Sequence, residues 1–206
     1  MALGSGALLV ACAETARLPL SAGIGNDPTL VAPRHTLLPT VNIAPAQGWL
    51  AGAKPVPAPG TRVEAFARDL DHPRWLLALP NGDVLVAESN APPKPDDGKG
   101  IKGWVMKKVM KRAGAGVASA NRITLLRDSD GDGVADQRFV LLSALNSPFG
   151  MALVGDELFV ANTDAVLRFP YRTGQTRIDT QGTVVTELPA GTINHHWTKN
   201  LIASAD

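Results

Sequence analysis

The sequence is notable first for what it lacks. Its single cysteine excludes an internal disulfide and a cysteine-based zinc site. With 20 Lys and Arg against 19 Asp and Glu, it has no basic excess of the kind that nucleic-acid binding needs. It has no P-loop and no Gly-x-Ser-x-Gly motif, so P-loop nucleotide chemistry and serine-hydrolase functions lack support. Its N-terminal apolar run, residues 2–11, is too short to cross a bilayer.

The composition that is present favours a folded chain rich in turns. Hydrophobic residues make up 45% of the sequence and charged residues 19%, which is typical of a globular protein and not of a disordered one. The 206 residues include 20 glycines and 16 prolines. Such frequent turn residues favour an all-β fold.

The N-terminus resembles an export signal. Residues 1–12 end in Leu9-Val10-Ala11-Cys12, which resembles the bacterial lipobox, although no Lys or Arg precedes the apolar run. We therefore expect lipidation of Cys12 and a periplasmic, membrane-anchored lipoprotein; the alternative is a buried cysteine on an N-terminal helix. Residues 13–60 contain eight prolines and no persistent period, which predicts a semi-extended linker.

Residues 61–206 contain a β repeat. The segments HPRWLLALPNGDVLVAE (72–88) and SPFGMALVGDELFVAN (147–162) share one template of two short strands around a tight Gly-containing turn. A third copy begins at HHWTKNL, from residue 195. Further strands are predicted at 122–127, 137–142, 166–170 and 183–188.

The spacing of the copies indicates the architecture. Leu153 and Leu201 are 48 positions apart, whereas Leu79 and Leu153 are 74 apart, so the first interval carries an insertion of roughly 26 residues within 91–120. A β repeat of about 48 residues is typical of a propeller blade. The domain then holds about two and a half blades, fewer than a closed ring needs. We expect the front part of a longer propeller.

Four motifs carry a family resemblance: PRWLLALPNGDVLVAES, SANRITLLRDSDGDGVAD, SPFGMAL and NHHWTKNL. They resemble the glucose/sorbosone dehydrogenase family, in particular bacterial L-sorbosone dehydrogenase-type proteins. The resemblance implies a six-bladed β-propeller that uses pyrroloquinoline quinone (PQQ) and calcium to oxidise sugars or sugar-derived aldehydes in the periplasm, passing electrons to an acceptor.

Three residues are candidates for the site. His196 lies at the start of the third copy, where it matches Arg74 and Phe149, and the resemblance makes it the catalytic base. His195 is expected to face the other way. Arg74 is a candidate for gripping a quinone carboxylate or a sugar hydroxyl, and the resemblance places Asn146 near the sugar. The alternatives are structural: a strand-capping histidine, a salt bridge and an ordinary turn.

An acidic loop follows the strand predicted at 122–127. Asp128, Asp130, Asp132, the Val134 carbonyl and Asp136 match the spacing of an EF-hand calcium loop, with Gly133 at its turn. Phe139 replaces the final glutamate of that motif, and the flanks are predicted strands. We expect a structural calcium ion; the alternative is a turn without metal.

The insertion contains a basic segment, 101–112, whose spacing predicts an amphipathic helix. It would lie on an anionic membrane surface or pack its Trp104 face on the propeller. Two functions compete with the dehydrogenase for the whole chain: a non-catalytic propeller lipoprotein that binds a ligand or partner, and a metal-dependent hydrolase of the lactonase kind.

Overall fold

The computed structural model describes residues 18–31, 43–93, 95, 100–192 and 194–204. The chain divides into two compact units, Met1–Pro45 and Ala46–Asp206. The first contains a short 3-10 helix, η1 (Leu20–Gly23), and the second contains every strand found among the described residues. Cys12, the predicted signal and parts of the predicted linker lie outside the described residues, so lipidation and export stay predictions. Within the described ranges, no helix is long and apolar enough to span a membrane.

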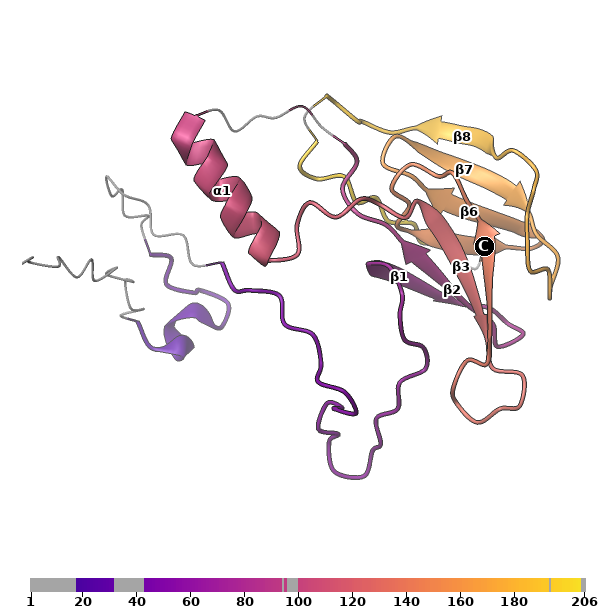
Figure 1. Cartoon of the computed structure of the whole chain (residues 1–206), viewed down its shortest axis with the longest axis horizontal. Coiled ribbons are helices and arrows are strands. Elements are labelled where there is room, and N and C mark those ends of the chain that lie inside the picture. The colour runs from indigo at the N-terminus through magenta and orange to yellow at the C-terminus, as the bar shows by residue number, and fades with distance from the viewer. Residues whose placement is uncertain (1–17, 32–42, 94, 96–99, 193, 205–206) are drawn as a thin grey trace, which may run out of the picture. The chain divides into compact units, whose positions relative to one another are not determined.

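The second unit is built on two four-stranded antiparallel sheets, each formed by consecutive strands in chain order (Figure 1). The first sheet comprises β1 (Pro73–Ala78), β2 (Val84–Glu88), β3 (Arg122–Arg127) and β4 (Gln137–Leu142). The second comprises β5 (Met151–Val154), β6 (Glu157–Ala161), β7 (Ala165–Pro170) and β8 (Thr183–Glu187). The blades of a β-propeller are four-stranded antiparallel sheets of this kind. The all-β prediction is confirmed, and the two sheets are consistent with part of a propeller.

The strands lie where the sequence predicts them, because their apolar spacing and turn residues are unambiguous. The β1–β2 hairpin turns at Gly82, whose φ of +90° is readily adopted only without a Cβ. The β5–β6 hairpin turns at Gly155, with φ of +56°. The middle strands β2 and β3 are buried along most of their length, whereas β8 is exposed throughout.

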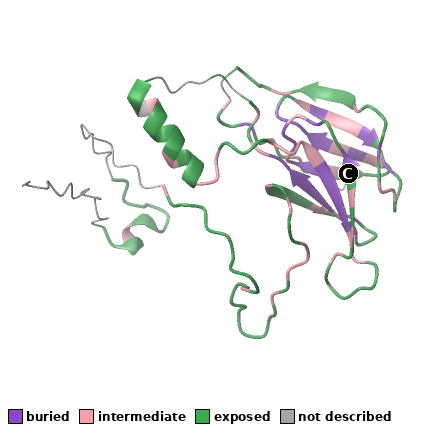
Figure 2. Ribbon diagram, in the orientation of Figure 1, coloured by how far each residue is buried: buried purple, intermediate pink, exposed green. Residues whose placement is uncertain are grey.

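The core lies between the two sheets (Figure 2). Leu85, Leu125 and Leu141 of the first sheet and Leu158 and Val160 of the second are all fully buried in one cluster. Burial of large aliphatic side chains contributes about 1.5–3 kcal/mol each, so this contact stabilises the pair of sheets.

The third copy of the repeat begins against the second sheet. Residues 195–204 form no strand, but the Gly150 amide donates a 2.9 Å hydrogen bond to the Lys199 carbonyl. A Cβ on Gly150 would lie 2.5 Å from the Leu201 amide nitrogen and 2.6 Å from Asn200 Cα. Only glycine therefore allows this close backbone approach.

A hydroxyl group joins each copy to the next. Ser89 follows β2 and donates to the Pro148 carbonyl, just before β5. Thr163 follows β6 and donates a 2.9 Å hydrogen bond to the Trp197 carbonyl, where the third copy starts. Both hydroxyls lie two positions after the Val-Ala pair of their copy. The repeat thus carries its own link between successive units.

The chain between β2 and β3 contains the helix α1 (Gly100–Arg112), as the sequence predicts. Most of its residues are exposed (Figure 2), and Trp104 is 61% exposed. The Trp104 face is therefore not packed on the two described sheets, and its packing on the rest of a propeller stays a prediction. The other expectation, contact with an anionic membrane, is taken up below.

The topology separates two ends of the sheets. Strands β1 and β5 begin at one end, where β2 and β6 also terminate. We call this end the Arg74 end. The opposite end carries the β3–β4 loop with its aspartates, and we call it the Asp-loop end. Contacts between the sheets match this division: Ser89 meets Pro148 at the first end, and Arg127 meets the Gly174 carbonyl at the second.

Candidate functional site

An arginine and three aromatic rings meet at the Arg74 end. The Arg74 guanidinium carbon lies 5.9 Å from the Phe149 ring centre and 5.3 Å from that of Trp197. The Trp75 and Phe149 ring centres are 5.3 Å apart, and Phe149 meets Trp197 edge to face at 6.5 Å. Each pair falls within the range of a cation–π or aromatic contact. We call these four residues the aromatic cluster.

Arg74 is held by rings and not by a carboxylate. Among the described residues it forms no ion pair, so the salt bridge that was its structural alternative is not formed there. The side chain is exposed, whereas Trp197 is buried beneath it. The guanidinium keeps its donors available for an anionic or hydroxylated ligand.

His196 directly precedes the buried Trp197, so its backbone lies next to the cluster. Its carbonyl accepts a 3.3 Å hydrogen bond from Lys199 Nζ, and its side chain is exposed. Arg74 and Phe149, which match His196 in the repeat, contact each other. The structure thus brings two of the three matched positions, Arg74 and Phe149, into contact. Both also approach the ring of Trp197, the residue that follows His196.

Asn146 lines a pocket of about 330 Å³ at the same end. It sits in the β4–β5 connection, and its carbonyl accepts the Thr163 amide at 3.0 Å. The pocket wall is mostly polar or proline; it consists of Pro92, Pro93, Pro95, Asn146, Thr163, Asp164, Ala190, Gly191, Thr192 and Asn194. The amide, hydroxyl and carboxylate groups of these residues are of the kind that suits a ligand with several hydroxyls.

Thr163 connects the pocket to the aromatic cluster. It lines the pocket, and its hydroxyl donates to the carbonyl of Trp197. The same hydroxyl oxygen accepts a 3.4 Å hydrogen bond from Asn194 Nδ2. Since Asn194 is two positions before His196, the segment with the predicted base runs between the pocket and the cluster.

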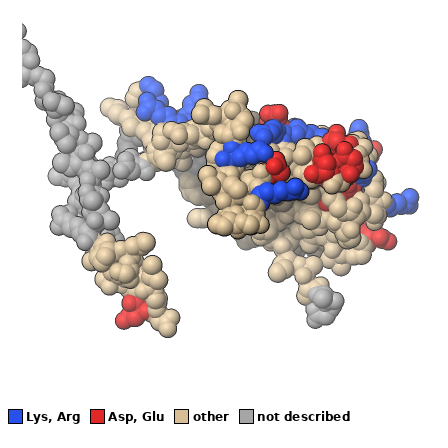
Figure 3. Space-filling view, turned by 90° about the horizontal axis from the view of Figure 1, so that it is seen from below, with Lys and Arg blue, Asp and Glu red and all other residues tan. Residues whose placement is uncertain are grey.

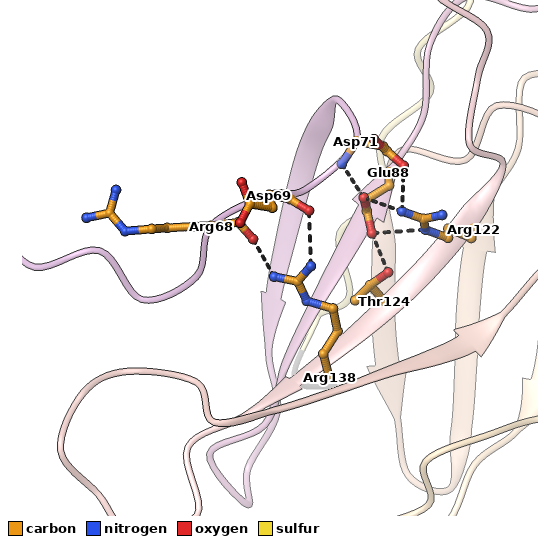
Figure 4. A network of polar contacts seen from close by, with 7 residues as sticks. All are labelled: Arg68, Asp69, Asp71, Glu88, Arg122, Thr124 and Arg138. Atoms are coloured by element: carbon orange, nitrogen blue, oxygen red, sulfur yellow. Dashed lines mark hydrogen bonds and ion pairs between the residues drawn. The ribbon is translucent and has the colours of Figure 1, made fainter. Parts of the chain in front are cut away.

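A buried carboxylate fixes the backbone beside this site (Figure 4). Glu88 is only 1% exposed, and its carboxylate accepts from Arg122 Nε at 3.1 Å and Arg122 Nη2 at 2.9 Å. The Thr124 hydroxyl and the Asp71 amide also donate to it. Burial acts to raise the pKa of Glu88, but these hydrogen bonds outweigh it and hold that pKa below its ordinary value.

The Glu88 network and, separately, Arg138 hold the chain that enters β1. Arg122 also donates to the Asp71 carboxylate at 2.8 Å, and Arg138 donates to the Asp69 carbonyl at 3.0 Å (Figure 4). Asp69 and His72 both have positive φ, which non-glycine residues rarely adopt. The network therefore stabilises a sharp bend only two residues before Arg74.

The predicted calcium loop lies at the Asp-loop end, away from the pocket. Ligand atoms of Asp128, Asp130 and Asp132 all lie within 4.8 Å of one another. The Asp128 carboxylate accepts the Gly133 and Gly131 amides at 2.8 Å, which lowers its pKa. Three carboxylates at this separation match the hard oxygen donors that calcium prefers.

Asp136, the fourth predicted carboxylate, makes a different contact. It accepts hydrogen bonds from the Ser129 hydroxyl and amide, and these lower its pKa. It is not part of the close carboxylate group. The loop is also fixed from outside, because the Ala135 amide donates to the Phe66 carbonyl at 2.8 Å.

Sequence reasoning missed Thr163, Asp164 and Asn194 as pocket residues. A signal for two of them was present: polar residues follow the Val-Ala pair in both copies, as Glu88-Ser89-Asn90 and Asn162-Thr163-Asp164. The prolines of the pocket wall, Pro92, Pro93 and Pro95, had no such signal, because the insertion has no period that would place them.

These observations place the chain in the class of all-β proteins. Its sheets resemble propeller blades, and a polar site lies at one end of them. Residues 80–206 match the family model of a domain of unknown function, DUF7133, so the chain belongs to that family. A search of curated proteins found no match. A similar solved structure is the holo form of the PQQ domain of pyranose dehydrogenase from Coprinopsis cinerea, with 16% identity and a TM-score of 0.44. The match covers 66% of this chain and 25% of that one.

Proposed function

We propose that this chain forms part of a PQQ-dependent dehydrogenase that oxidises a sugar or sugar-derived aldehyde in the periplasm. The observation that carries the proposal is Arg74, which lies over Phe149 and Trp197 without an acidic partner among the described residues, beside a polar pocket. The sequence motifs that resemble sorbosone dehydrogenases support the same chemistry.

The residues present fit a planar, carboxylated cofactor. Arg74 would donate hydrogen bonds to a carboxylate of PQQ, and the adjacent rings would offer aromatic surface to its plane. When bound, PQQ supplies a quinone that accepts the hydride lost by the substrate carbon.

The polar groups of the pocket would position the substrate. Asn146 and Asn194 offer amide donors and acceptors, and Asp164 offers a carboxylate, for the hydroxyls of a sugar or hydrated aldehyde. The His196 imidazole would accept the proton of the hydroxyl that becomes the carbonyl. Oriented hydroxyls and a nearby base are what this two-electron oxidation needs from the protein.

We also propose that the Asp loop binds calcium in a structural role. Asp128, Asp130 and Asp132 supply clustered carboxylates. The loop lies at the end of the sheets opposite Arg74, so an ion there would act on stability and not on the reaction. Any calcium that accompanies PQQ would be a separate ion.

PQQ binding by the intact gene product tests the assignment. We expect Arg74→Ala to weaken PQQ binding about tenfold or more, the effect of losing a hydrogen bond to a charged group. Arg172→Ala is the matched control, because Arg172 is exposed in the β7–β8 connection at the other end. Unchanged affinity in Arg74→Ala would remove Arg74 from the site. No PQQ binding by the wild type would favour the non-catalytic propeller that binds another ligand or partner.

A further inference from the structure

Helix α1 exposes apolar side chains that a globular protein ordinarily buries. Ile101 is 84% exposed and Trp104 61%, and Val105, Met106 and Met110 are also exposed. A helix in a soluble domain normally turns its large apolar residues towards a core. The exposed surface of α1 is therefore suited to an external partner.

The exposed tryptophan lies within a basic stripe. Ile101, Trp104, Lys108 and Lys111 are spaced at i, i+3, i+7 and i+10, so they share one face of the helix, which we call the Trp104 face. The Lys108 ammonium lies 4.8 Å from the Trp104 ring centre. Tryptophan with flanking lysines is the combination found where proteins meet the headgroup region of a bilayer.

All the charged side chains of helix α1 are positive. Its 13 residues contain five Lys or Arg and no acidic residue, and no Asp or Glu occurs from residue 100 to 127. Figure 3 shows Lys and Arg side chains at the end of the surface where α1 lies. The chain as a whole carries only +1, so this is a local positive patch and not part of a broad basic surface.

We propose that the Trp104 face docks on an anionic lipid bilayer. Lys108, Lys111 and Arg112 would lie among the lipid phosphates, each contributing by attraction to the negative surface. Trp104 and Ile101 would enter the interface, where apolar side chains gain by leaving water. A nucleic acid matches the charge but offers no apolar phase for Ile101, so the lipid surface fits both properties.

The proposal does not depend on the dehydrogenase assignment or on lipidation. The test therefore uses the full chain with Cys12→Ala, which removes any lipid anchor. Co-sedimentation is measured with vesicles of phosphatidylcholine alone and of phosphatidylcholine with phosphatidylglycerol in equal parts. We expect binding to the anionic vesicles only, weakening as salt screens the charges.

Charge reversal identifies the surface. Lys108→Glu, Lys111→Glu and Arg112→Glu together should weaken partitioning about a hundredfold or more. The matched control reverses Arg62, Arg172 and Arg177, which are exposed and outside the helix, and should retain most of the binding. Equal binding to both vesicle types, or equal loss in both triple variants, would overturn the proposal.

A spectroscopic measurement keeps the test independent of folding. Brominated lipids quench a tryptophan that enters the bilayer, so anionic brominated vesicles should quench the wild-type protein. Trp104→Phe preserves an apolar ring and should still bind, but with most of that quenching lost. Quenching that persists in Trp104→Phe would place another part of the chain in the membrane, and binding to an oligonucleotide without binding to vesicles would assign the helix to nucleic acid.

Discussion

At the scale of single residues, the buried carboxylate of Glu88 stabilises the folded state, and the sequence does not predict it. Its pKa is lowered in the folded state, so its contribution to the free energy of unfolding is fully present above about pH 4.3, the ordinary pKa of a glutamate, and is lost as the pH falls through the folded-state value. The molecule should therefore lose stability in acid partly through this carboxylate.

We predict that Glu88→Gln lowers the free energy of unfolding by about 2–3 kcal/mol at pH 7, because hydrogen bonds to a charged group are lost. The difference from the wild type should shrink as the pH falls below about 4.3, because the Glu88 carboxylate of the wild type then becomes protonated. Urea unfolding at pH 7 and at about pH 3 measures it. Glu157→Gln is the control, because that half-buried carboxylate pairs with the half-buried Arg168. An equal loss at both pH values would show that shape and not charge makes Glu88 necessary.

Gly150 offers a second test at this scale. In Gly150→Ala the new Cβ would overlap the backbone of Asn200 and Leu201, so the third copy must move away from β5. We expect a loss of about 1–3 kcal/mol, the usual effect of overpacking, and faster hydrogen exchange of the Gly150 amide. Gly48→Ala, where nothing lies within 4 Å, is the control. Wild-type exchange in Gly150→Ala would contradict this contact.

At the scale of elements, the sequence predicted the strands well because each has apolar spacing bounded by turn residues. The strands predicted at 122–127 and 137–142 match β3 and β4 to the residue. The Glu88 network could not be predicted, because Arg122 is 34 positions away and reaches Glu88 only through the β2–β3 register. Register over such a long connection depends on the packed fold and not on local pattern.

The Asp loop is an element with its own prediction. If it binds calcium, added calcium should raise the melting temperature, because a ligand that binds only the folded state stabilises it. Asp130→Ala with Asp132→Ala should remove that part of the rise. Asp156→Ala, in the exposed β5–β6 turn, serves as the control. The same calcium response in the double variant and the wild type would show that the loop is a turn without metal.

At the scale of the whole molecule, the repeat predicted that equivalent positions would meet at one end, and Arg74 and Phe149 do so. It did not predict the pocket, because Asn146, Asp164 and Asn194 come from three different connections whose paths depend on packing. The sequence also left open which side chain of the third copy enters the cluster. The structure identifies Trp197, with its backbone tied to Thr163.

The most direct test of the proposed function is dye-coupled oxidation of a sugar aldehyde by the intact gene product, loaded with PQQ and calcium. We predict that His196→Ala lowers kcat a hundredfold or more, the scale of a lost general base. His195→Ala, its neighbour, should have a far smaller effect. A wild-type kcat in His196→Ala would contradict the assignment of the base.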